Sequence, residues 1–261
     1  MRLDVYLVEK GLAKSREAAK RMIEEGCVLI DGKTIQKPAY AVDENIADKI
    51  EAKDPLAYVG RGGLKLEAAL SAFDLDVRGM TALDVGASTG GFTDCLLQKG
   101  VEKVFALDAG HDQLHPSLRK DTRVVSLEGQ NARSMTPELF GGTLMDLIVM
   151  DVSFISATYL IPLFDSLLKE GGRAIVLVKP QFEVGKAALG KRGIVKDPKA
   201  QLAALEKVLA CGEDFGLSVL GVMASPILGG DGNREFLALF CKESAKKNLL
   251  TDADLRRVVW Q

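Results

Sequence analysis

Four charged residues of this chain stand where they could carry out proton transfer. They flank short apolar runs typical of buried strands, or a glycine-rich segment, and they are Lys65, Asp151, Lys179 and Glu235. In an open α/β sheet, ligands bind in the crevice outside the carboxyl ends of the strands. Asp151 follows MDLIVM and Lys179 follows AIVLV, so we expect both side chains to point into one crevice.

A lysine in such a crevice could act as a general base. Desolvation favours its neutral amine, nearby carboxylates favour the ammonium, and a second lysine favours the amine again. A neutral amine could take a proton from a sugar hydroxyl. Any one of these charges could instead belong to a surface ion pair, because ion-pair networks also place charges at strand ends. A surface ion pair explains the four charges together less well than it explains any one of them alone.

The segment LDVGASTGGFTD, residues 83–94, is compatible with three chemistries. It contains G-x-S-x-G, the nucleophile elbow of hydrolases, but that fold needs a histidine late in the chain, and the two histidines are His111 and His115. It also resembles a dinucleotide loop, but it lacks the second glycine of G-x-G-x-x-G, which lets the backbone approach a pyrophosphate. The remaining interpretation is a loop that binds S-adenosylmethionine.

This third interpretation fits a strand that ends at Gly86, then a loop, then a helix that begins at Phe92. Glycines allow a tight turn and let a ligand lie against bare backbone, and a helix N-terminus can receive a carboxylate. The next strand, KVFALD, ends in Asp108, whose carboxylate could accept both ribose hydroxyls of a nucleoside. The alternative is that Asp108 only caps a loop.

The residues after the fourth strand bear on the methyl acceptor. Enzymes that methylate a base amino group often carry D/N-P-P-Y at this place. Here the segment reads Asp151-Val152-Ser153-Phe154 and lacks the Pro-Pro pair. An oxygen acceptor, activated by a lysine, is therefore the better interpretation.

Two basic segments favour a nucleic-acid partner, although the net charge of the whole chain is −2. The loop EVGKAALGKRGIVKD carries the cations Lys186, Lys191, Arg192 and Lys196. The first helices carry the cations Lys14, Arg16, Lys20 and Arg21. Phosphates of an RNA backbone are the expected partner of both segments. The alternative in each case is solvated surface charge.

The elements that must position these residues divide the chain in two. Residues 1–53 predict a small α+β domain, with a helix that stops near Gly11, a second helix over SREAAKRMIEEG and a hairpin that turns at Asp31-Gly32. Residues 54–63 are rich in proline and glycine and predict a linker. Residues 64–261 predict the catalytic domain.

Residues 64–261 alternate apolar strands with helices, the pattern of a doubly wound, Rossmann-like α/β sheet. Five continuous apolar runs suit parallel strands buried on both faces, and they are TALDV, KVFALD, RVVSL, LIVMDV and RAIVLVK. We expect helices over residues 91–100, 115–121, 155–172 and 197–216, and closing strands over 218–227 and 233–242. A final short helix should pack through Leu255, Val258 and Trp260.

Composition argues against several other classes of protein. The 261 residues are 47% hydrophobic and 27% charged, as in soluble globular proteins. The four cysteines show no C-x-x-C spacing, which argues against a zinc site and a disulfide framework and favours a reducing cytoplasm. We find no signal peptide and no apolar run long enough to span a membrane, so we expect neither a membrane partner nor a bound metal.

Five segments together resemble the TlyA and hemolysin A family of ribosomal RNA methyltransferases, namely YVGRGGLKL, LDVGASTGGFTD, VMDVSFIS, LVKPQFE and GNREFL. The N-terminal pattern resembles the RNA-binding domain of small-subunit ribosomal protein S-four, and the rest resembles an FtsJ-type catalytic domain. The resemblance implies a catalytic tetrad at Lys65, Asp151, Lys179 and Glu235. It implies cofactor contacts at Gly86, Ser88, Gly90, Gly91, Asp108 and Asn131. One departure is Gln130, where the family usually has a threonine.

The resemblance also implies a reaction. A methyl group would pass from S-adenosylmethionine to the 2′-hydroxyl of a cytidine in ribosomal RNA, with Lys179 as the base and ribosomal RNA or ribosomal subunits as partners. Two alternatives stay open. One is a non-catalytic, RNA-binding factor of ribosome assembly. The other is membrane lysis, suggested by the family's older name, although the chain has no convincing amphipathic basic helix.

Overall fold

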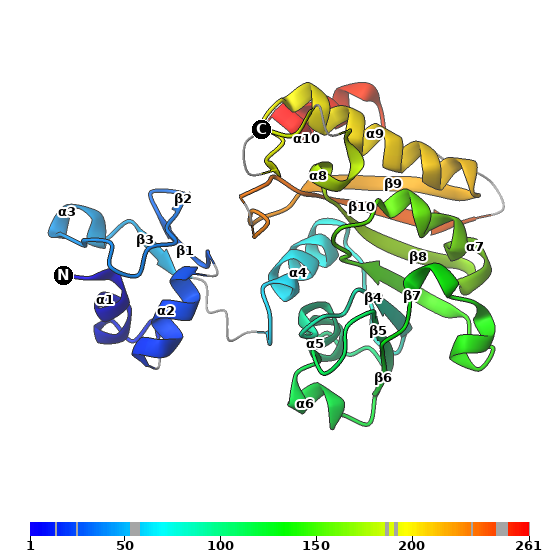
Figure 1. Cartoon of the computed structure of the whole chain (residues 1–261), viewed down its shortest axis with the longest axis horizontal. Helices are drawn as coiled ribbons and strands as arrows, with labels where there is room; N and C mark the ends of the chain where they lie inside the picture. The colour runs from blue at the N-terminus through cyan, green and yellow to red at the C-terminus, as the bar shows by residue number, and fades with distance from the viewer. Residues whose placement is uncertain are drawn as a thin grey trace. The chain divides into compact units, whose positions relative to one another are not determined.

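A computed structural model gives the fold of the chain (Figure 1). It describes residues 1–13, 15–24, 26–52, 58–185, 188–190, 193–230, 232–243 and 250–260, with the side chains of residues 21 and 44 left out. The chain divides into two compact units, Met1–Arg61 and Gly62–Gln261. Residues 54–57 of the expected linker lie outside the described residues, whereas Gly62 and Gly63 already belong to a helix of the larger unit.

The smaller unit is an α+β fold. Its elements are α1 (Leu3–Glu9), α2 (Arg16–Glu24), β1 (Val28–Ile30), β2 (Lys33–Thr34), α3 (Glu44–Ala47) and β3 (Ile50–Ala52). The strands pair antiparallel in the order β2-β1-β3. The turn between β1 and β2 has φ of 54° at Asp31 and 72° at Gly32, the positive values of a type I′ hairpin. The sequence predicts this hairpin and the first two helices, and it misses α3 and β3.

One buried carboxylate joins the first two helices of this unit, in addition to their apolar core. Asp4 of α1 is fully buried, and the guanidinium groups of Arg2 and Arg16 lie 2.9 and 3.4 Å from its carboxylate. The hydrogen bond from Arg2 keeps the pKa of Asp4 below its usual value, so the carboxylate stays charged inside the unit. The core residues around it are Leu3, Leu7, Ala19, Met22, Ile23 and Val28.

Among the described residues, the larger unit forms a seven-stranded sheet. Its strands are β4 (Thr81–Val85), β5 (Lys103–Asp108), β6 (Val124–Glu128), β7 (Met145–Met150), β8 (Leu168–Val178), β9 (Leu217–Ala224) and β10 (Phe236–Lys242). Figure 1 shows their order, β6-β5-β4-β7-β8-β10-β9, from the bottom of the view to the top. Strand β10 runs antiparallel to both neighbours. The strand order reverses between β4 and β7, which is where doubly wound sheets bind ligands.

Helices and 3-10 turns cover both faces of this sheet. They are α4 (Gly62–Ala72), α5 (Gly91–Gln98), α6 (Pro116–Arg119), η2 (Ala132–Ser134), η3 (Pro137–Phe140), η4 (Ala157–Tyr159), η5 (Ile161–Leu163), α7 (Phe164–Leu167), α8 (Pro180–Glu183), α9 (Pro198–Asp214) and α10 (Asp252–Trp260). On one face, Val176 of β8 packs in a core with Leu205 of α9 and Val259 of α10. On the other face, Asp84 of β4 accepts hydrogen bonds from Thr93 of α5. The doubly wound sheet expected from the sequence is confirmed.

The continuous helix expected over residues 155–172 is wrong. The chain forms η4, η5 and α7 there, and residues 168–172 already belong to β8. Pro162 contributes to the break, because its ring would clash with the carbonyl four residues earlier in an uninterrupted α-helix. The sequence also misses α4 and α8, which both carry residues of the site described below.

The C-terminal helix α10 packs against α9 and β9, but not through all the expected residues. Leu255 and Val259 are buried in the core, Val258 is partly buried against it, and Trp260 is 50% exposed. Arg234 donates hydrogen bonds to the carbonyls of Val258 and Val259 at 3.2 and 2.7 Å, which satisfies acceptors that a helix end leaves unpaired. Trp260 is therefore excluded from the buried face.

Candidate active site

The carboxyl ends of β4 and β7 approach closely because residue 86 is a glycine. Gly86 follows β4 with a φ of 85°, and a Cβ at this position would lie 2.6 Å from the carbonyl oxygen of Asp151, the residue after β7. The N–H of Asp151 donates to the carbonyl of Val85, so the two strand ends are also hydrogen-bonded. A side chain at position 86 would push the loop after β4 away from Asp151.

The later glycines of this loop shape its connection to α5. Gly90 is the N-cap of α5 with a φ of 95°, and a Cβ there would collide with Leu114 and Leu118. Gly91 is the first residue of α5 and is buried. Neither glycine is among the residues that line the cavity beside the loop, so their visible contribution is to the course of the backbone.

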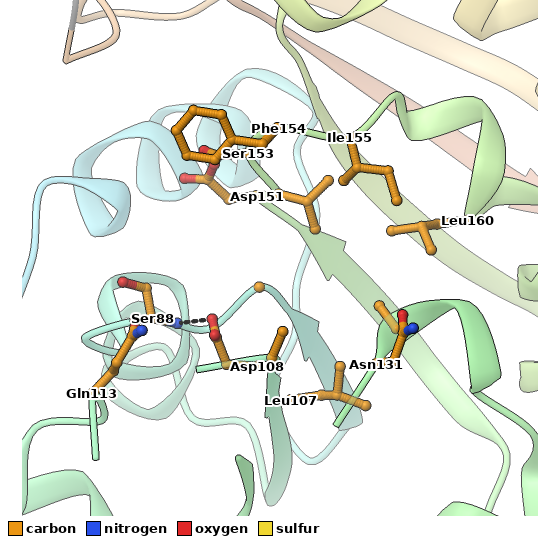
Figure 2. A pocket seen from close by; sticks show the side chains of 14 residues that line it. Ser88, Leu107, Asp108, Gln113, Asn131, Asp151, Ser153, Phe154, Ile155 and Leu160 are labelled. Atoms are coloured by element: carbon orange, nitrogen blue, oxygen red, sulfur yellow. Dashed lines mark hydrogen bonds between the residues drawn. The ribbon is translucent and has the colours of Figure 1, made fainter. Parts of the chain in front are cut away.

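A cavity of about 400 Å³ opens beside the loop, between the ends of β4, β5 and β7 (Figure 2). Pockets for small organic ligands begin at about this size. Of the residues expected to bind the cofactor, Gly86, Ser88, Asp108 and Asn131 line it. Its apolar wall includes Leu107, Ile155 and Leu160. Figure 2 shows Asp151 and Ser153 on one side of the cavity and Asp108 and Asn131 on the other.

Asp108 faces the cavity while it braces the glycine loop. Its Oδ2 accepts the N–H of Ser88 at 2.8 Å, as Figure 2 shows, and its Oδ1 accepts the N–H of Gly110 at 2.7 Å. A carboxylate oxygen has two lone pairs. Asp108 can therefore cap the loop and still accept the hydroxyls of a ribose, so the two interpretations drawn from the sequence are compatible.

Two side-chain amides contribute polar groups to the same part of the cavity. The Oδ1 of Asn131 accepts the N–H of Arg133 at 3.0 Å, which orients the amide at the start of η2. Gln113 also lines the cavity and lies so close to Gly110 that no Cβ would fit between them. The sequence does not single out Gln113, because it stands in a polar loop without a recognisable pattern.

Lys179 and Asp151 form an ion pair on the opposite side. The Nζ of Lys179 lies 2.7 Å from Oδ1 of Asp151 and donates a hydrogen bond of 2.8 Å to Oγ of Ser153. Lys179 is only 9% exposed. The pair forms because β7 and β8 are parallel neighbours, so the residues that follow them emerge at the same edge of the sheet.

A second ion pair, more deeply buried, joins Lys65 of α4 to Glu235, the residue before β10. Nζ of Lys65 and Oε2 of Glu235 are 2.6 Å apart, and the two residues are 7% and 2% exposed. Both charged groups are thus removed from water, and each acts as the counter-ion of the other.

The two ion pairs belong to one cluster. The register of β10 against β8 places Glu235 opposite Lys179. The first turn of α4 lies beside Asp151, since a Cβ on Gly62 would be 3.8 Å from the Oδ2 of that residue. The structure therefore brings the four residues singled out in the sequence to one edge of the sheet, as two ion pairs.

Phe154 is an exposed aromatic residue in the wall of the cavity. It is 92% exposed, and its φ of 64° is a left-handed conformation that bulky residues seldom adopt. Its ring packs against that of Phe182, with centroids 5.4 Å apart. Strained backbone of this kind clusters at functional sites. The sequence contains no sign of the conformation, so Phe154 is not singled out there.

The sequence matches known protein families over most of its length. Residues 58–242 match the FtsJ-like methyltransferase family and residues 1–45 match the S4 domain. The chain is 45% identical over 235 residues to the Mycobacterium tuberculosis protein named 16S/23S rRNA (cytidine-2'-O)-methyltransferase TlyA, which covers 90% of this chain and 87% of that protein. It is 41% identical over 240 residues to hemolysin A of Brachyspira hyodysenteriae, which covers 92% and 99%.

The chain belongs to the TlyA and hemolysin A family of FtsJ-like methyltransferases. Its fold agrees with this: the structure of a presumptive hemolysin from Streptococcus thermophilus superposes with a TM-score of 0.78 at 42% identity, over 100% of this chain and 94% of that one. The resemblance drawn from the five sequence segments is confirmed.

The residues of this methyltransferase that we expect to bind RNA are described only in part. The following lie outside the described residues, in the case of residue 21 by its side chain alone: Lys14, Arg21, Lys186, Lys191 and Arg192. Lys20 is exposed on α2, and Arg16 is exposed although its guanidinium contacts Asp4. A role of these cations in RNA binding stays a prediction.

Within the part of the chain that the structure describes, no group of three or more His, Cys, Asp or Glu residues is placed to hold a metal ion. No helix in that part is long and apolar enough to cross a lipid bilayer.

Asp84 is a fully buried carboxyl group of β4, two residues before Gly86. Its Oδ2 accepts the N–H and the hydroxyl of Thr93 at 2.9 and 2.7 Å, whereas its Oδ1 has no hydrogen-bond partner among the described residues. Burial raises the pKa of Asp84 to about 7, the charge of Asp151 adds to the rise, and the bonds from Thr93 oppose it.

We expect Asp84 to make the fold less stable as the pH rises. A carboxyl whose pKa is higher in the folded than in the unfolded state binds more protons when folded, so its stabilising contribution is lost between the unfolded value of 3.8 and the folded value of about 7. At 1.4 kcal/mol per pKa unit the loss is at most roughly 4 kcal/mol. Denaturant unfolding without cofactor, at pH 5 and pH 8, should show that the Asp84→Asn variant loses less stability than the parent. Parallel pH profiles for the two proteins would contradict the assignment.

Breaking the buried pair should cost far more than replacing it. Glu235→Ala leaves the Lys65 ammonium buried without a counter-ion, which should lower the free energy of unfolding by about 3–5 kcal/mol. The double variant Lys65→Met with Glu235→Leu removes both charges and should regain most of that loss. Urea unfolding followed by circular dichroism measures both. A single variant as stable as the parent would show that the pair is not sequestered from water.

Proposed function

We propose that this protein transfers a methyl group from S-adenosylmethionine to the 2′-hydroxyl of a cytidine ribose in ribosomal RNA. The observation that carries the proposal is a single cavity with two differently equipped sides. One side has Asp108 beside the glycine loop, and the other has Asp151 with Lys179 bound to it at 2.7 Å. The first side suits a nucleoside cofactor, and the second suits a hydroxyl that must lose a proton.

The side of Asp108 fits S-adenosylmethionine. The Asp108 carboxylate can accept the ribose hydroxyls, the apolar side chains of Leu107 and Ile155 can contact the adenine ring, and the bare backbone at Gly86 allows close approach. The amide of Asn131 adds a polar group for the base. When bound, the cofactor supplies an electrophilic methyl carbon attached to a sulfonium centre.

Lys179 is the proposed general base. The ammonium of its ion pair with Asp151 would first release a proton to water, and the neutral amine could then take the proton of the 2′-hydroxyl. A bound cofactor would supply the methyl carbon to that oxygen, and its sulfur would keep the electron pair of the broken C–S bond. Asp151, 2.7 Å away, then stabilises the ammonium that forms, and Ser153 fixes the direction of the amine through its hydrogen bond. The charge that develops on Lys179 thus meets a carboxylate already in place, which is electrostatic preorganisation.

Lys65 and Glu235 keep these groups in place. Their ion pair connects α4 to the start of β10, and both elements lie beside the Asp151–Lys179 pair. Much of the rate of such a reaction comes from aligning the acceptor, the methyl donor and the general base to within a fraction of an ångström. The second pair therefore acts on the reaction mainly through position.

The acceptor nucleoside is proposed from Phe154 and from the relatives. Nucleobases of single-stranded RNA stack on exposed aromatic side chains. Phe154 is such a side chain, and the residue before it, Ser153, accepts a hydrogen bond from Lys179, the proposed general base. The Mycobacterium tuberculosis relative is named for cytidine in 16S and 23S rRNA, which supports the same nucleoside here. Ribosomal subunits in the cytoplasm are the proposed substrates, with residues 1–45 as a further RNA contact.

Lys179→Ala should strongly lower the rate of methyl transfer while sparing the proposed cofactor site. Loss of a general base lowers the rate by roughly 10²- to 10⁴-fold, and the residues around Asp108 are not touched. Transfer of labelled methyl to ribosomal RNA and calorimetric titration with S-adenosylmethionine measure the two effects.

Lys169→Ala is the matched control, because Lys169 pairs with Asp146 at the same 2.7 Å at the opposite ends of the same two strands. Full activity of the Lys179 variant would refute the assignment, and a parent protein that binds RNA without methylating it would favour an assembly factor.

Phe154→Ala should weaken RNA binding at the site of reaction. Stacking of a base on an aromatic ring contributes about 1–3 kcal/mol, so KM for ribosomal RNA should rise by about 5- to 150-fold. Phe154→Trp should keep KM near that of the parent. Phe215→Ala is the control, since Phe215 is 47% exposed at the end of α9, outside the cavity. An unchanged KM in Phe154→Ala would argue that the ring does not touch the substrate.

A further inference from the structure

The segment between β7 and η4 carries the acceptor side of the cavity without regular structure of its own. Residues 151–156 belong to no helix or strand. Phe154 within it holds a positive φ and an almost fully exposed ring. A bulky residue keeps such a conformation only where its surroundings determine it. The contacts that hold this segment therefore decide where the acceptor can lie.

Glu183, the last residue of α8, supplies two of those contacts. Its Oε2 accepts the hydroxyl of Ser156 at 2.5 Å, and its Oε1 accepts the N–H of Ala157 at 2.7 Å. Glu183 is 8% exposed and does not line the cavity. The ammonium of Lys207, on α9, approaches Oε2 at 3.2 Å and also binds the carbonyl of Glu183 at 3.0 Å. The carboxylate is thus buried, neutralised and engaged on both oxygens.

Helix α8 connects this carboxylate to the proposed base within one turn. Lys179 is the N-cap of α8 and Glu183 is its last residue, four positions later. Pro180, the first residue of α8, has the fixed φ that suits a helix start. The distance between the two charged side chains is therefore set by one short, rigid element.

The N-cap of α8 and two residues of the helix contact the irregular segment, in the same order along both stretches of chain. Lys179 binds Ser153, and Phe182 packs against Phe154. Glu183 binds the end of the segment at residues 156 and 157. The segment is held at both ends by charged groups and in the middle by a ring.

We propose that Glu183 is a positioning residue for the methyl acceptor. By fixing residues 153–157 against α8, it keeps Ser153 at the amine of Lys179 and the ring of Phe154 at the cavity. That the acceptor is an RNA nucleoside rests on the proposed function, whereas the holding of the segment rests on the contacts alone. A carboxylate suits the task because one of its oxygens accepts the hydroxyl of Ser156 and the other accepts the N–H of Ala157.

The first test compares three variants in methyl transfer to ribosomal RNA. Glu183→Ala removes both acceptors, and displacement of reacting groups by about 1 Å lowers kcat/KM by about 10²-fold. Glu183→Gln should restore most of kcat/KM, since its oxygen can accept from Ala157 and its amide can donate to Ser156. Asp146→Ala is the matched control, because Asp146 also accepts one backbone N–H, that of Thr81 at 2.9 Å, and one lysine, at the other end of β7.

The second test reads the segment without RNA. The chain has one tryptophan, Trp260, so a Phe154→Trp, Trp260→Phe protein reports on position 154 alone. Glu183→Ala in that background should lower the fluorescence anisotropy of the reporter, and Asp146→Ala should leave it unchanged.

The outcomes separate this proposal from the proposed function. A parent protein that methylates no RNA refutes the proposed function, and the reporter then decides alone whether Glu183 holds the segment. Unchanged anisotropy in Glu183→Ala overturns the proposal. So does an equal loss of kcat/KM in Glu183→Ala and Asp146→Ala, because that loss would reflect stability only. A loss confined to Glu183→Ala, with rescue by glutamine and unchanged affinity for S-adenosylmethionine, supports it.

Discussion

Two lysines buried at one edge of a sheet impose the main constraint on this structure. An ammonium taken out of water needs a carboxylate within hydrogen-bonding reach, and the partners here are distant in the chain: 170 positions separate Lys65 from Glu235. The antiparallel strand β10 makes the second pair possible. Parallel strands bring only their carboxyl ends to the active edge, whereas β10 enters the sheet there, so the residue before it lies opposite Lys179.

Glu235 and the two residues before it each contact a different segment of the larger unit. Oδ1 of Asn233 accepts the N–H of Val195 at 2.9 Å, which fixes the end of the basic loop. Arg234 binds the carbonyl of Val259 in the C-terminal helix. Glu235 itself holds α4 through its ion pair. Three consecutive side chains thus anchor three separate segments, and all three belong to GNREFL, one of the five segments that resemble the family.

The positions of Gly86, Asp151 and Lys179 at the sheet edge could be predicted because their signals are local. Apolar runs mark the strands, and a charge or a glycine immediately after a strand lies at the sheet edge by topology alone. Glu183 and Phe154 could not be found this way. The role of Glu183 depends on which loop packs on α8, and that of Phe154 on a backbone conformation without a sequence signature. The helix wrongly expected over residues 155–172 has the same origin, since an apolar run containing Pro162 cannot reveal whether it continues as helix or breaks into 3-10 turns.

The two sides of the cavity are nevertheless coupled, because Asp151 contacts the glycine loop on one side and Lys179 on the other. Its carbonyl oxygen is the atom that requires glycine at position 86, and its carboxylate is the partner of Lys179. A displacement of the glycine loop would therefore move the residue that pairs with Lys179. Packed groups of this kind change position together rather than one at a time. The short distance from the end of β4 to the end of β7 thus fixes the position of the glycine loop relative to the Asp151–Lys179 pair.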